Sequence, residues 1–121
     1  MNSICIFGVF VADLCFFAEK IPVKGETVLG KNHIIGPGGK GSNQAIAAAR
    51  LGGNVNFITK IGKDQNARMA LKLYEEAGIN TGSIIQDPNQ STGVAGIMIN
   101  EKTGDNACLL YTSPSPRDTE V

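Results

Sequence analysis

The sequence predicts an α/β fold with a mainly parallel sheet flanked by helices. Stretches rich in β-forming residues alternate with stretches of helical spacing, which is typical of this class. The first stretch, residues 3–10, is almost continuously apolar, as in a parallel strand covered on both faces. A glycine-rich segment at residues 36–43 then leads directly into strong helix formers, Gln44 to Leu51.

Composition limits the class of protein. The chain has 121 residues with 11 basic and 11 acidic side chains, so no basic surface favours a nucleic-acid partner. No apolar run reaches the roughly 20 residues that span a bilayer. Three cysteines without a C-x-x-C pair, and the single His33, predict no metal site. We expect a reducing, cytoplasmic setting.

The remaining elements follow in chain order. We expect two short strands or one bent strand at 27–35, and Gly52-Gly53 ends the first helix. A strand at 55–61 precedes a turn in which Asp64 is a plausible helix N-cap. Helical spacing of apolar residues predicts a helix over 66–77 that ends at Gly78. Two further strands are expected at 83–86 and 94–99.

The glycine-rich segment is the strongest candidate for a binding site. Four glycines and a proline in six positions, 36–41, argue against a regular element there. Its end coincides with a helix N-terminus, where free backbone N–H groups and the helix dipole favour a polar or anionic ligand. A dinucleotide-binding loop and a turn without any ligand are the alternatives. The first lacks the acidic residue that it requires at the end of the next strand.

Two polar side chains fit a ligand rich in hydroxyl groups. Asp13 lies just past the expected first strand, at the end where open α/β sheets bind ligands. An ionised carboxylate accepts hydrogen bonds from neighbouring hydroxyls, and the Asn43 amide both donates and accepts. The alternatives are a turn residue for Asp13 and a helix cap for Asn43.

Several separated landmarks resemble the N-terminal part of the ribokinase-like (PfkB) carbohydrate kinases. The resemblance covers about residues 4–106 and includes the segment Gly38, Gly39, Lys40, Gly41, Ser42 and Asn43. The other landmarks are Gly8 with Asp13, Pro22 with residues 25–27, residues 62–64, residues 76–79 and residues 91–95. This set is far more specific than a glycine pattern alone.

The resemblance implies a ribokinase-like fold in which a small β lid covers the sugar. The lid strands are expected within about 14–36 and 92–101. It also implies ATP-dependent phosphorylation of a sugar hydroxyl, with D-ribose converted to ribose 5-phosphate. The implied cofactors are ATP, Mg²⁺ and K⁺. Asp13 and residues 38–43, including Lys40, are the implied sugar-binding residues, and Gly38 and Gly39 are also the implied hinge of the lid.

One departure bears on the sugar. The family usually has asparagine two residues before the aspartate, where this chain has Val11. A valine offers no hydrogen bond, so another sugar or nucleoside kinase of the family is an alternative. A homodimer through the lid is expected by analogy.

The end of the chain departs from the family. We expect a kinase-domain part over 1–106 and an aberrant, disordered tail over 107–121, rich in Ser-Pro steps. The family's catalytic base and nucleotide site lie further on than this sequence reaches. The chain alone is therefore expected to be inactive, and a truncated product without function is the remaining alternative.

Overall fold

The computed structural model describes residues 2–111 of the chain. Within them it has seven strands and two helices. Their bounds are β1 Ser3–Phe7, β2 Val11–Ala18, β3 Asn32–Gly38, α1 Lys40–Arg50, β4 Asn54–Gly62, α2 Gln65–Ala77, β5 Ile84–Asp87, β6 Gly93–Asn100 and β7 Asn106–Tyr111.

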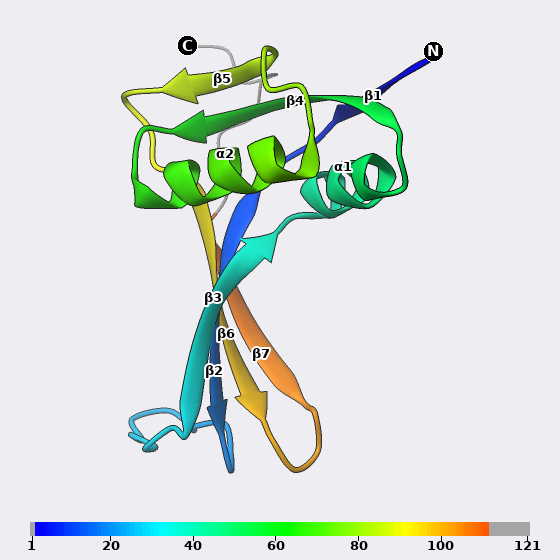
Figure 1. Ribbon diagram of the computed structural model, residues 1–121. Helices are drawn as coiled ribbons and strands as arrows, with labels where there is room; N and C mark the ends of the chain where they lie inside the picture. Colours follow the sequence, from blue (N-terminus) through cyan, green and yellow to red (C-terminus); the bar gives the residue numbers. More distant parts are fainter. Residues whose placement is uncertain (1, 112–121) are drawn as a thin grey trace.

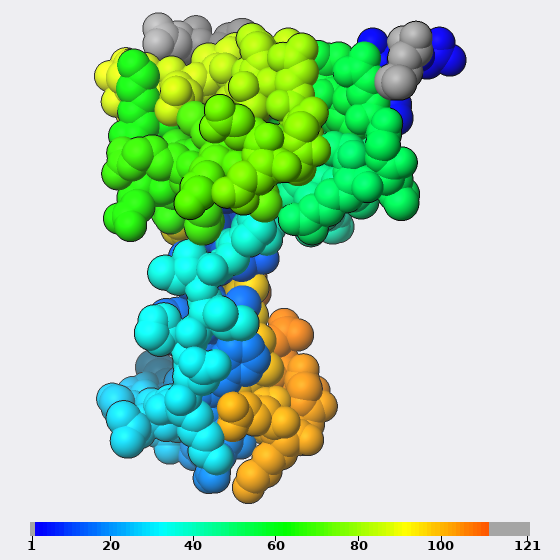
Figure 2. Space-filling model, in the orientation of Figure 1, coloured from blue at the N-terminus to red at the C-terminus, as the bar shows by residue number. Residues whose placement is uncertain are grey.

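The strands form two separate sheets. The first is parallel, in the order β1-β4-β5, and both helices lie on one of its faces (Figure 1). The second, in the order β3-β2-β6-β7, has β2 parallel to β6 and the outer strands antiparallel. It projects from the first sheet as a narrower lobe (Figure 2). The α/β fold predicted from the sequence is confirmed.

The core lies between the helices and the first sheet. Alternate residues of β4 point toward the helices, and Val55, Phe57 and Ile61 are fully buried there. The Tyr74 ring of α2 meets Phe57 and Phe10 edge-on, with ring centroids 5.4 and 6.2 Å apart. Edge-to-face aromatic contacts of this kind add to the stabilisation from apolar burial.

The ends of the helices follow from local chemistry. Asp64 caps α2, its carboxylate accepting a hydrogen bond of 2.8 Å from the Ala67 amide, as predicted. Gly78 ends α2 in the left-handed conformation, with φ 81°. In contrast, the residue before α1 is Gly39, with φ 96°, and no side chain caps this helix. Its N-terminal amides therefore remain available.

The apolar run at 3–10 is not a single strand. β1 ends at Phe7 and β2 begins at Val11, so the run crosses from one sheet to the other. The expectation that both faces are covered is also wrong for β1, where Phe7 is 51% exposed. Among the described residues, β1 is an edge strand, and α1 and α2 cover only one face of its sheet (Figure 1).

The glycine-rich segment is more regular than its composition suggests. β3 continues through Gly36, Pro37 and Gly38, and α1 begins at Lys40. Proline is compatible with a strand at a sheet edge, where its missing N–H breaks no ladder bond, and β3 is such an edge. The prediction of irregular backbone over 36–41 is therefore wrong, except at Gly39.

The boundary expected at residue 106 falls inside a strand. Residues 107–111 pair with β6 in an antiparallel ladder, with Cys108 opposite Ile97. They form β7 instead of the expected disordered tail, and the ladder satisfies the backbone groups on the side that faces β6. The rest of the expected tail, 112–121, lies outside the described residues. No helix in the described range is long and apolar enough to cross a membrane.

Candidate functional site

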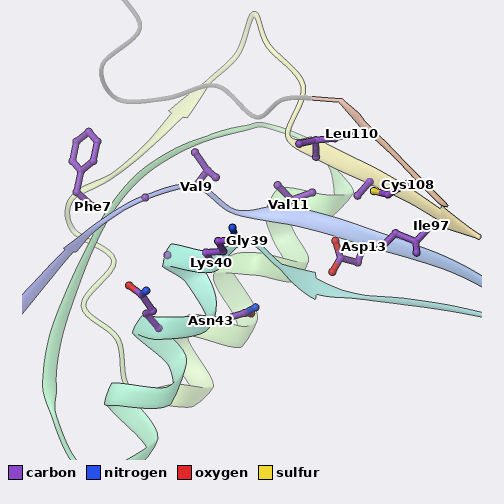
Figure 3. A pocket seen from close by; sticks show the side chains of 14 residues that line it. Phe7, Val9, Val11, Asp13, Gly39, Lys40, Asn43, Ile97, Cys108 and Leu110 are labelled. Atoms are coloured by element: carbon purple, nitrogen blue, oxygen red, sulfur yellow. The ribbon is translucent and has the colours of Figure 1, made fainter. Parts of the chain in front are cut away.

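A cavity of about 890 Å³ opens where the two sheets meet (Figure 3). It is bordered by the link between β1 and β2, the start of α1, and the facing strands β2, β6 and β7. Its lining residues are Phe7, Gly8, Val9, Val11, Asp13, Gly39, Lys40, Gly41, Asn43, Gln44, Ala95, Ile97, Cys108 and Leu110.

Asp13 supplies the only acidic side chain in this lining. It lies on β2 between Gly36 of β3 and Ala95 of β6, to which it is aligned in register. No side chain or amide of residues 2–111 donates a hydrogen bond to its carboxylate, and burial raises its pKa above the ordinary value of 3.8. A half-buried carboxylate without a partner favours a ligand that donates hydrogen bonds.

Two glycines allow the backbone to fit around the carboxylate and the helix start. A Cβ at Gly38 would collide with the Asp13 carboxylate, and one at Gly39 would collide with the Val9 carbonyl. Gly39 also has φ 96°, a conformation that other residues rarely adopt. The close contact between Gly8 and Gly41 seats α1 against the β1–β2 link in the same way.

Asn43 and the first turn of α1 provide polar groups on the other side of the cavity. Asn43 is exposed and its backbone N–H bonds to the Gly39 carbonyl at 2.9 Å, but no side chain caps α1. The cap interpretation of Asn43 is therefore wrong. Its amide borders the cavity together with Lys40 and Gly41 (Figure 3).

The rest of the wall is mostly apolar. Val11 is 7% exposed and lies two residues before Asp13 on the same face of β2. Ala95 and Ile97 of β6 and Leu110 of β7 continue that face. Sequence reasoning did not identify these β6 and β7 residues as lining a site. Alternation along residues 93–100 was visible, but the strand pairing that brings them to Asp13 was not.

Two of the predicted binding residues do not line the cavity. Ser42 is fully buried and shares a hydrogen bond of 2.7 Å with the Tyr74 hydroxyl. Burial raises the pKa of Tyr74 to about 12, against the opposing effect of this bond. Ser42 therefore anchors α1 to α2, which corrects its predicted role in binding. Gly38 acts only by leaving room for Asp13.

The arrangement suits a small polyol. A carboxylate and an amide line one cavity whose remaining wall is mostly apolar. Vicinal hydroxyls donate to the first and exchange hydrogen bonds with the second. Within the described range, no three His, Cys, Asp or Glu side chains gather as metal ligands.

The sequence of this chain matches a known protein family. The model of the pfkB family carbohydrate kinases matches residues 1–118. The chain belongs to the pfkB family of carbohydrate kinases. The match extends past residue 106, where the resemblance was expected to end, so the family part of the chain is longer than predicted.

Individual pfkB kinases support the assignment. The chain is 38% identical to the ribokinase of Bacillus subtilis over 110 residues, which are 91% of the chain and 37% of that protein. It is 36% identical to the deoxyribokinase of Salmonella typhi over 108 residues, or 89% of the chain and 35% of that protein.

A solved structure extends the comparison to the fold. Arabidopsis thaliana ribokinase complexed with ribose and ATP superposes with a TM-score of 0.81 at 27% identity, covering 90% of the chain and 35% of that protein. The ribokinase-like fold predicted from the sequence is therefore confirmed. The chain spans about a third of the length of these relatives.

Proposed function

We propose that this chain is the sugar-binding part of an ATP-dependent kinase that converts D-ribose to ribose 5-phosphate. The observation that carries the proposal is the unpaired Asp13 carboxylate in a cavity that Asn43 also lines. The resemblance of the chain to ribokinases, one of them a complex with ribose and ATP, supports the choice of sugar and phosphoryl donor.

In this proposal each lining residue has a distinct task. Asp13 accepts hydrogen bonds from two adjacent sugar hydroxyls, and Asn43 fixes the position of a third. Ala95 and Ile97 pack against the apolar face of the sugar ring and keep water from the polar contacts. The chain's contribution to catalysis is then positioning of the hydroxyl that receives the phosphoryl group.

The phosphoryl donor and the ions are proposed for the whole protein and not for this chain alone. ATP supplies the transferred group, and Mg²⁺ and K⁺ are the ions expected with it. The described residues contain no cluster of metal ligands, and the proposal gives neither ion a role within this chain. The catalytic base, a cytoplasmic location and a homodimer through the lid stay predictions.

A second candidate substrate is 2-deoxy-D-ribose. The specific observation is Val11, which lies against the cavity where the family usually has asparagine. A valine cannot bond a hydroxyl and leaves it unsatisfied on burial, whereas a sugar lacking that hydroxyl incurs no such cost. The resemblance to a deoxyribokinase supports this alternative.

Binding of the two sugars to the 121-residue chain, measured by calorimetry, tests the proposal. In Val11→Asn, and in the smaller change Val11→Thr, the preference for D-ribose over 2-deoxy-D-ribose should rise about tenfold, the value of one hydrogen bond. Val23→Asn is the control, because Val23 is 67% exposed and lies outside this cavity. Failure of the unaltered chain to bind either sugar would overturn the proposed function.

A further inference from the structure

A compact hydrogen-bonded group joins three elements away from the cavity. The Asp64 carboxylate accepts bonds from the Thr92 amide and hydroxyl, at 2.8 and 2.7 Å. The same carboxylate caps α2 through the Ala67 amide, at 2.8 Å. The Thr92 oxygen in turn accepts a bond of 3.0 Å from the Gly62 amide. The end of β4, the start of α2 and the residue before β6 are thus held together.

The group is tightly packed and charged. Thr92 is 2% exposed, and a Cβ at Gly62 would collide with the Gln90 carbonyl and approach the Thr92 amide to 2.9 Å. Burial opposes the charge of Asp64, but the bonds from Thr92 and Ala67 outweigh it and lower its pKa. Charged hydrogen bonds in partly buried positions are among the stronger ones.

Its position in the fold gives the group a task. The chain passes between the two sheets at three places: residues 8–10, the Gly38–Gly39 step, and residues 88–92. At the third crossing, Asp64 fixes the chain at Thr92. β6 begins at the next residue, and it carries Ala95 and Ile97 into the cavity wall.

We propose that Asp64 is a positioning residue for the cavity, acting through Thr92 on β6. Because Thr92, the residue before β6, is held in place, β6 presents Ala95 and Ile97 at a fixed place opposite the start of α1. Asp64 itself does not line the cavity, so its effect is indirect. As far as it concerns the sugar, this inference rests on the proposed function. The placement of β6 does not.

Two substitutions separate this task from helix capping. Asp64→Ser keeps a side-chain oxygen that can cap α2, but it is too short to hold Thr92. Thr92→Val keeps the shape of the side chain and removes the hydroxyl, and Thr92→Ser restores the hydroxyl. Asp87→Ser is the control, since Asp87 accepts a similar amide bond of 2.8 Å from Asn89 and pairs with Lys60 at 3.4 Å, both away from β6.

Hydrogen exchange of the unligated 121-residue chain tests the inference. Asp64→Ser and Thr92→Val should each speed exchange of the β6 amides about tenfold, the loss of one strong hydrogen bond. The α2 amides should stay protected in both. Thr92→Ser and Asp87→Ser should leave β6 unchanged. Dissociation constants for D-ribose should follow the same order, also by about tenfold.

Three results would overturn the inference. One is β6 exchange in Asp64→Ser and Thr92→Val equal to that of the unaltered chain. Another is loss of α2 protection alone, which would reduce Asp64 to a cap. The last is global unfolding of both variants, which would make the group a support of the whole fold. Absence of ribose binding by the unaltered chain would instead remove the proposed function and leave the exchange result to decide the role of Asp64.

Discussion

Two aspartates, Asp13 and Asp64, lie in different environments that shift their pKa values in opposite directions. Asp13 faces the cavity without a partner, and burial raises its pKa. Asp64 is also partly buried, but bonds from Thr92 and Ala67 lower its pKa overall. Ionised Asp13 therefore costs folding free energy at neutral pH, whereas ionised Asp64 contributes it. The Asp13 carboxylate is free to bind a ligand, and the Asp64 carboxylate stabilises the fold.

Asparagine substitutions should reveal this difference. Asp13→Asn should raise the free energy of unfolding at pH 7, and the gain should vanish as pH falls below the ordinary pKa of 3.8. Asp64→Asn should lower that free energy at pH 7 by about 1–3 kcal/mol, with the loss shrinking as acid protonates Asp64. Urea unfolding from pH 3 to 8 measures both, and equal signs for the two variants would contradict the assignment.

At the scale of elements, the crossing from β3 to α1 depends on one glycine. Gly39 has φ 96°, and a side chain there would strike the Val9 carbonyl. Gly52, which follows α1, has nearly the same angle, φ 94°, but has open space around its Cα. Alanine would strain the backbone at both positions. Only at Gly39 would its Cβ also collide with another atom.

Alanine at each position therefore isolates the clash. Gly52→Ala should destabilise the chain by about 1–2 kcal/mol, the cost of the left-handed conformation for a residue with a Cβ. Gly39→Ala should cost about 1–3 kcal/mol more, as overpacking does. Thermal unfolding monitored by circular dichroism compares the two variants. Equal destabilisation would mean that the backbone at Gly39 moves without cost.

Elements with local signals were predictable from the sequence. The α2 helix was expected over 66–77 and spans Gln65–Ala77. The prediction succeeded because the apolar spacing and both helix caps are local features of the sequence. A strand beginning at Val11 was not predicted, because the pairing of β2 with β6 joins residues about eighty positions apart. Pairing between distant residues leaves no local pattern.

The same limit applied to the site. Asp13, Lys40 and Asn43 were predicted and border one cavity. Ser42 was predicted with them because it belongs to the segment 38–43 that resembles the family. Successive side chains of a helix point about 100° apart, however, and Ser42 faces the core. The apolar wall from β6 and β7 could not be predicted, since only the sheet register places it opposite α1.

At the scale of the whole molecule, the cavity exists because the two sheets meet there. The start of α1 supplies polar groups, and the second sheet supplies Asp13 and the apolar wall (Figure 3). The three crossings between the layers are short, so small changes there alter the distance between Asp13 and Asn43. The site is thus a property of how the layers are joined.

The most direct test of this account is the affinity of the chain for D-ribose with Asp13 and Asn43 replaced by alanine. Each replacement should weaken binding about tenfold or more, the value of a lost hydrogen bond to a charged or amide group, and the double variant should show no detectable binding. Asp105→Ala and Asn89→Ala, at exposed turns outside the cavity, should bind as the unaltered chain does. Unchanged ribose affinity in the double variant would contradict the account.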